Sequence, residues 1–235
     1  MRHTTTFLTH PAWRATVPVA LFMAAALVFR LALYRMYPAD FQGLSVKQVI
    51  EALGVGLRFD LSMALLMVGV PVLLQLLPFR WSRGPVWQGV WHWFHYASLL
   101  VFVFMMAIDL VYFGNVHRHV GSEINTLSQD MGAMGGIALR QYVPALLAFA
   151  LGALGFAWAW SKFSPTAISV PKSVGLRLIV LPFVFLAMVV VARGGVGGKP
   201  LSVGEAFFSS VPAQGYLALN GAFAMSRALI ESPPG

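Results

Sequence analysis

Five apolar runs, each long enough to cross a bilayer, fix the class of structure that this chain can adopt. A helix needs about 20 predominantly apolar residues to cross the hydrocarbon core, because each residue adds only about 1.5 Å along its axis. In lipid a spanning segment has to satisfy its own backbone hydrogen bonds, and a helix does so. The sequence therefore predicts an all-α membrane protein, a bundle of five transmembrane helices at about 15–34, 53–77, 93–113, 142–160 and 174–192.

The composition excludes most soluble classes. Of the 235 residues, 58% are hydrophobic and 10% are charged, whereas about a quarter of the residues in a soluble domain are charged. The chain has no cysteine, which excludes a disulfide framework and a thiolate metal site. A net charge of +8 would suggest nucleic acid as a partner of a soluble protein. Here the basic residues lie mostly in short connections, where topology and anionic lipid account for them, and no nucleic acid is expected.

The connections between the runs predict the orientation. The basic connections at 78–92 and 161–173 contain no acidic residue, whereas the one at 36–50 and the C-terminal segment 193–235 do contain acidic residues. The positive-inside rule places the acid-free face in the cytoplasm. The N-terminus is therefore expected in the cytoplasm, and the C-terminus on the opposite side of the membrane.

The first run is interpreted as an uncleaved signal anchor. Arg2, His3 and Arg14 form a basic flank before it, and no small-residue cleavage pattern of the kind that marks a signal peptide follows it. Its far end carries the basic and aromatic residues typical of a membrane interface: Arg30, Tyr34, Arg35 and Tyr37.

Charged residues inside the apolar runs are the first candidates for a special role. Arg58 lies in the second run, and Asp109 lies within a turn of the far end of the third. An unpaired charge at the bilayer centre costs about 3 kcal/mol on insertion scales. We expect an intramembrane polar network of Arg58, Asp60, Asp109 and Glu123, with Arg58 paired to Asp109 or Asp60. The alternative is that Arg58 and Asp60 lie near a helix end and extend to the headgroups.

Two segments outside the runs are amphipathic. In 114–139, apolar residues recur every three or four positions, which predicts a helix along the membrane surface. In 205–230, turns alternate with amphipathic pieces, which again predicts interfacial helices. The expected organisation is a five-helix transmembrane domain over 1–192, followed by an extracytoplasmic juxtamembrane linker over 193–235.

His117, His119 and Glu123 are close in sequence and raise the question of a metal site. In a helix His119 and Glu123, four residues apart, share a face, but His117 points away from them. We therefore expect an interfacial histidine pair and no metal site in this chain.

Five short motifs, in this order along the chain, carry a family resemblance: GLRFDLS (56–62), DLVYF (109–113) followed by Arg118 and Glu123, RGG (193–195), KPL (199–201) and LALN (217–220). With the five runs, they make the chain resemble the membrane domain of lipoteichoic acid synthase-like phosphoglycerol transferases, which belong to the alkaline phosphatase and sulfatase superfamily. In that family, five transmembrane helices precede an extracytoplasmic domain with a nucleophilic threonine and a divalent metal, usually manganese. That domain moves glycerol phosphate from phosphatidylglycerol onto an acceptor.

The resemblance implies a binding role for this chain, which ends before any such domain. It implies a multi-pass anchor in the cytoplasmic (inner) membrane of a bacterium, which presents phosphatidylglycerol to its own downstream catalytic domain. No catalytic residue and no cofactor is expected within the chain itself. Arg118, Arg193 and Lys199 are the candidates for headgroup binding, because cations at that level attract phosphate. The alternative is that they only solvate a helix end.

Two other functions remain open. The chain is also compatible with the membrane domain of a phosphoethanolamine transferase, which shares the five spans and the type of catalytic domain. It is compatible as well with a stand-alone small transporter or scaffold. A transporter is expected to have inverted repeats or broken helices, and neither is clear in this sequence.

Overall fold

A computed structural model describes residues 11–79, 81–124, 143–162, 174–197 and 199–231. Within these ranges the chain forms helices and no strand. Three helices are long and apolar enough to cross a membrane: α2 (Pro11–Met36), α4 (Val46–Leu76) and α5 (Pro85–Val116). The prediction of an all-α fold is therefore confirmed for the described residues, and three of the five predicted spans coincide with helices that could cross a membrane. Helices α8 (Val143–Lys162) and α9 (Val174–Ala192) occupy the positions of the fourth and fifth predicted runs.

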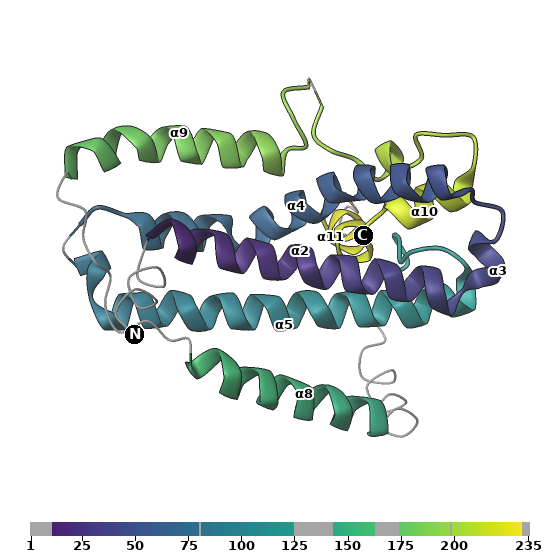
Figure 1. Cartoon of the computed structure of the whole chain (residues 1–235), viewed down its shortest axis with the longest axis horizontal. Coiled ribbons are helices and arrows are strands. Elements are labelled where there is room, and N and C mark those ends of the chain that lie inside the picture. The colour runs from purple at the N-terminus through teal and green to yellow at the C-terminus, as the bar shows by residue number, and fades with distance from the viewer. Residues whose placement is uncertain (1–10, 80, 125–142, 163–173, 198, 232–235) are drawn as a thin grey trace.

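The long helices lie side by side (Figure 1). Helix α4 packs against both α2 and α5, while α9 lies against α4 and α8 lies against α5 on the outside. Successive helices run in opposite directions. As a result α2 and α5 end where α4 begins, and we call this the exit end of the bundle (Figure 1). Helix α9 ends beside the middle of α4, where Ser62 Oγ donates to Ala192 O.

Two helices are longer than their apolar runs. Helix α4 has 31 residues and α5 has 32, so that each is about 47 Å long against about 30 Å of hydrocarbon. Helix α4 begins with a capping box, in which Ser45 Oγ accepts from Gln48 N and Ser45 N donates to Gln48 Oε1 at 2.9 Å. The predicted starts at 53 and 93 fall inside these helices. Hydropathy marks the part of a helix that contacts lipid, whereas the caps mark where it ends.

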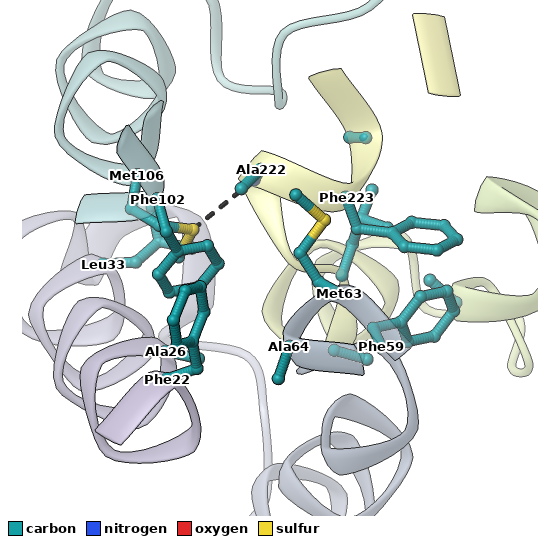
Figure 2. Packing of buried hydrophobic residues seen from close by; sticks show 14 of the residues in the cluster. Phe22, Ala26, Leu33, Phe59, Met63, Ala64, Phe102, Met106, Ala222 and Phe223 are labelled. Atoms are coloured by element: carbon teal, nitrogen blue, oxygen red, sulfur yellow. Dashed lines mark hydrogen bonds between the residues drawn. The ribbon is translucent and has the colours of Figure 1, made fainter. Parts of the chain in front are cut away.

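The core joins the long helices to the C-terminal segment. Phe22 of α2 packs against Phe102 of α5 with ring centroids 5.0 Å apart. Phe59 of α4 meets Phe223 edge-on at 5.2 Å. Figure 2 shows both contacts, with Met106 accepting a hydrogen bond from the backbone of Ala222. The C-terminal segment is thus part of the same core.

The C-terminal segment packs against the long helices. It forms η2 (Val203–Ala206), α10 (Pro212–Ala218) and α11 (Gly221–Glu231), so the prediction of short helices there is confirmed. Several of their apolar residues are buried in the bundle, with Leu217, Ala222 and Phe223 at most 1% exposed, whereas Leu229 and Ile230 at the end of α11 are exposed. Figure 1 looks almost along α11, which crosses the bundle and contacts α4 and α5. Residues of 199–231 thus share a core with the long helices, while the predicted extracytoplasmic location of this segment stays a prediction.

The surface helix predicted over 114–139 is wrong where the structure describes it. Helix α5 continues to Val116 and is stopped by His117, whose φ of 57° is left-handed and whose backbone N–H donates to Phe113 O at 2.8 Å. Residues 118–121 are not helical. From residue 125 the predicted helix lies outside the described residues.

Candidate functional site

A buried ion pair joins α2 to α4. Arg30 donates from Nη1 to Asp60 Oδ2 at 2.5 Å and from Nη2 to Oδ1 at 2.7 Å. The two residues are 4% and 1% exposed. A bidentate pair of this kind is the geometry in which arginine and carboxylate bind each other most strongly. Each charge thereby has an oppositely charged partner, without which its burial in an apolar environment would be strongly destabilising.

The same arginine holds the turn between α10 and α11. Arg30 Nε donates to Leu217 O at 2.9 Å and Nη2 donates to Ala218 O at 3.2 Å. These carbonyls belong to the last turn of α10, where a helix leaves its acceptors unsatisfied. Asn220 then donates from Nδ2 to Asp60 Oδ1 at 2.8 Å and accepts from Phe223 N at 3.0 Å, which caps α11. The ion pair and the turn therefore stabilise each other.

Two glycines allow this close approach. A Cβ on Gly56 would lie 2.6 Å from Arg30 Cζ, and one on Gly221 would overlap the carboxylate of Asp109. Both positions are crowded by a charged side chain, so that any larger residue would displace one member of an ion pair. These contacts explain how the segments GLRFD (56–60) and LALNG (217–221), far apart in sequence, pack closely together in the fold.

A second buried pair lies at the end of α5. Asp109 Oδ2 is 2.6 Å from His119 Nδ1, and Oδ1 accepts from Val120 N at 3.0 Å. His119 Nε2 is 2.8 Å from Tyr216 O. Both imidazole nitrogens therefore face acceptors, and both must carry a proton for both bonds to form. Burial opposes a charge on His119, but the Asp109 carboxylate and the two hydrogen bonds together hold the pKa of this imidazole above its usual value.

We call Arg30, Asp60, Asp109, His119 and Asn220 the polar junction. Asp60 and Asp109 were predicted to belong to an intramembrane network, and the structure buries both of them. Their partners, Arg30 and His119, were not predicted. The signal for Arg30 was its position on the buried stripe of α2, which has helical spacing: Phe22, Ala26, Arg30 and Leu33.

Arg58 is outside the polar junction, and its predicted pairing with Asp109 or Asp60 is wrong. Its side chain is 50% exposed, with Nη2 3.3 Å from Glu205 Oε2 and 3.0 Å from Gly194 O. Residues two apart on a helix point to different sides. Asp60 therefore faces the bundle while Arg58 faces the 194–205 loop.

Glu123 belongs to a surface cluster beside the polar junction. Tyr112 Oη donates to Glu123 Oε1 at 2.5 Å, and Arg118 Nη1 lies 3.2 Å from the same oxygen. Partial burial would raise the pKa of Glu123, but the hydrogen bonds from Tyr112 and from backbone N–H groups, with the charge of Arg118, lower it below its usual value. Glu123 is therefore a fixed negative charge next to Arg118.

A pocket of about 450 Å³ opens between the 118–122 loop and the C-terminal segment. Its polar wall includes Arg118, His119 and Arg227, and its apolar wall includes Phe207, Tyr216 and Leu219. Arg227 Nη2 donates to Leu201 O, and its guanidinium lies over the ring of Phe223 at 5.5 Å. Two arginines thus line the pocket together with an apolar surface.

The other two predicted headgroup residues do not line this pocket. Arg193 and Lys199 are exposed on the loop after α9. The backbone of this loop packs against the core. Gly194 has a φ of +90°, a Cβ there would meet Leu201 at 2.7 Å, and Leu201 N donates to Arg193 O at 2.8 Å. The RGG and KPL motifs thereby hold Leu201 in the core.

The histidines do not converge on a common point. His117 Nδ1 lies 2.9 Å from Asp40 Oδ1 near the surface, whereas His119 is buried against Asp109. Among the residues that the structure describes, no three histidine, aspartate or glutamate side chains gather in a way that could hold a metal.

Comparisons with protein-family models, with curated proteins and with solved structures found no match to this chain. The phosphoglycerol transferase resemblance and its alternatives therefore stay predictions, and the geometry of the pocket has to support any function.

Proposed function

We propose that this chain is a membrane anchor that binds and presents an anionic phospholipid, as the membrane domain of a phosphoglycerol transferase-like protein. The observation that carries the proposal is the pocket at the exit end, where Arg118 and Arg227 face one space beside an apolar wall. Arginine binds phosphate through paired, charge-assisted hydrogen bonds. The apolar wall suits the glycerol and the first part of the acyl chains.

The size and place of the pocket support a headgroup site. A volume of about 450 Å³ lies in the range of small-molecule pockets, about 300–1,000 Å³. The pocket lies beside the last turns of α5, since His119 of its wall contacts Asp109, and a helix longer than the hydrocarbon core enters the interface with its last turns. A phospholipid in the surrounding leaflet would have its phosphate at this level.

The topology in the proposal has five spans with the pocket on the extracytoplasmic side. Helices α8 and α9, with 20 and 19 residues, are long enough to cross the hydrocarbon core. Their exposed apolar side chains support contact with lipid, for example Leu151 and Leu154 on α8 and Phe183 and Leu186 on α9. The location in the proposal is the bacterial cytoplasmic membrane, with the N-terminus in the cytoplasm.

In the proposal, the transfer reaction takes place in a different domain, outside this chain. The resemblance implies that a sulfatase-like domain, with its divalent metal, transfers the phosphoglycerol group. This chain supplies the anchor and the bound donor. The polar junction has a supporting role. Arg30 donates to Leu217 O and His119 contacts Tyr216 O, and these contacts fix the segment that places Tyr216 and Leu219 in the pocket wall.

The test is a titration of the purified chain in neutral detergent with short-chain phosphatidylglycerol. Arg118→Gln and Arg227→Gln should each weaken binding by about tenfold or more, as expected for the loss of a charge-assisted contact. The control is Lys199→Gln, which removes an exposed cation outside the pocket and should leave the Kd unchanged. An equal loss in all three variants would show that surface charge alone attracts the lipid. Tighter binding of phosphatidylethanolamine would favour the phosphoethanolamine transferase alternative.

A further inference from the structure

Glu123 carries a carboxylate next to the pocket, whose wall includes the cationic residues Arg118 and Arg227. Its Oε1 lies 3.2 Å from Arg118 Nη1, and Tyr112 donates to the same oxygen at 2.5 Å. Its Oε2 is 3.0 Å from where a Cβ on Gly121 would lie, so the carboxylate packs against the 118–122 loop that forms one pocket wall. The side chain is 26% exposed. A negative charge held in this way is unexpected beside a site for anions.

This carboxylate changes what Arg118 can offer to a ligand. A phosphate that binds Arg118 must share the guanidinium with Glu123, and the two anions then repel each other across it. The repulsion grows with the charge of the phosphate. It is smaller for a phosphodiester, with one negative charge, than for a phosphate monoester, which carries about 1.5 to 2 negative charges at pH 7.

We propose that Glu123 is a specificity-determining residue, which makes the pocket prefer a singly charged phosphodiester headgroup over a doubly charged phosphate monoester. The inference rests on the proposed function, since it presupposes that the pocket binds a lipid phosphate. Glu123 itself does not line the pocket, and it acts on the ligand through Arg118. Specificity of this kind comes from a repulsive element directed against the wrong ligand.

The experiment compares two short-chain lipids, phosphatidylglycerol and phosphatidic acid, in titrations of the detergent-solubilised chain at pH 8. The native chain should bind phosphatidylglycerol more tightly. Glu123→Gln keeps an acceptor for Tyr112 and removes the charge. It should tighten binding of phosphatidic acid by roughly tenfold and that of phosphatidylglycerol by clearly less, so that the preference shrinks or reverses.

Two further variants make the result specific. Glu205→Gln removes a carboxylate that does not line the pocket and that pairs with Arg58 and not with a pocket arginine, so it should leave both affinities unchanged. Glu123→Ala also removes the acceptor of Tyr112, yet it should shift the preference in the same direction as Glu123→Gln, because the two changes share only the loss of charge.

The outcomes separate the two proposals. If the native chain binds neither lipid, the pocket proposal fails and this one fails with it. If the native chain binds phosphatidylglycerol and Arg227→Gln abolishes that binding, but Glu123→Gln and Glu123→Ala leave the preference unchanged, only the role of Glu123 is wrong. Weaker binding of both lipids by both Glu123 variants would likewise overturn it, since Glu123 would then support the site.

Discussion

The two ends of the bundle bury polar groups in different ways. In the half of the bundle nearer the exit end, the polar junction consists of two ion pairs and an amide. At the opposite end, a second cluster of buried side chains consists of amides, imidazoles and an indole: Gln75, Gln88, His92, His95 and Trp160. In this cluster Gln88 Nε2 donates to Ser82 O at 2.7 Å, and His95 Nε2 lies 3.1 Å from Gln75 Oε1.

The clusters also differ in what they connect. The opposite-end cluster joins neighbouring helices, for example through the reciprocal contacts of His92 with Trp160 between α5 and α8. The polar junction instead joins α2, α4 and the end of α5 to a turn 160 residues or more from Asp60 and Arg30 in sequence. The ion pair of Arg30 and Asp60 is found where a segment distant in sequence, the turn between α10 and α11, is held against the long helices. Its loss should therefore cost more than the loss of an amide contact.

The largest effect is expected from breaking one ion pair of the polar junction. Asp60→Asn should lower stability by about 3–5 kcal/mol, because it leaves Arg30 buried without a carboxylate. Thermal unfolding in detergent measures the loss. Limited proteolysis should show the 193–231 segment becoming accessible first.

The coupling can be checked with the partner residue. Arg30→Met alone should be as harmful, but Arg30→Met combined with Asp60→Asn should cost clearly less than the sum of the single changes. Additive losses would mean that the pair does not act as a unit, and the contrast between the two ends would lose its basis.

The second ion pair gives the polar junction a dependence on pH. The pKa of His119 is raised in the folded state above its ordinary 6.5. The stability that this shift contributes is fully present below pH 6.5 and is lost as the pH rises through the folded-state pKa. Unfolding scans between pH 6 and pH 10 should therefore show falling stability on the alkaline side.

The matched control is the other histidine of the same loop. His119→Gln should flatten the alkaline decline, whereas His117→Gln, whose side chain is 63% exposed, should leave it in place. A decline that survives in His119→Gln would assign the pH dependence to another group.

A smaller effect is expected at the opposite end. Gln75→Leu removes the side-chain partner of buried His95 and should cost about 1–3 kcal/mol, the usual penalty for an unsatisfied buried polar group. The same unfolding assay applies, with Leu66→Ala on the exposed face of α4 as a control for changes on that helix. A loss as large as that of Asp60→Asn would erase the distinction between charged and uncharged clusters.

The sequence predicted the helices better than their contacts. Apolar runs of the right length are local signals, and all five coincide with helices. The place of the C-terminal segment depends on Arg30 and Asp60, which are far from it in sequence, and Asn220 and Gly221 read locally as turn residues of a linker. Arg30 was interpreted as interfacial because its neighbours Tyr34 and Arg35 are. Its burial follows only from which face of α2 meets α4.

The sequence analysis named only one of the two arginines that line the pocket. Arg118 was singled out by its cationic character and its place after the third run. Arg227 lies in an amphipathic stretch, where an arginine ordinarily faces solvent. Only the packing of α11 against α4 and α5 brings it to the pocket.

The smallest effect is expected at Arg58, the residue around which the sequence suggested a network. Its pair with Glu205 is 50% and 39% exposed, and exposed pairs contribute about 0.2–1 kcal/mol. Arg58→Ala should therefore destabilise the chain only slightly, and part of that loss should disappear at high salt because screening weakens exposed pairs. A loss of several kcal/mol, independent of salt, would mean that Arg58 is buried in the membrane-embedded protein. The polar junction would then have to include Arg58.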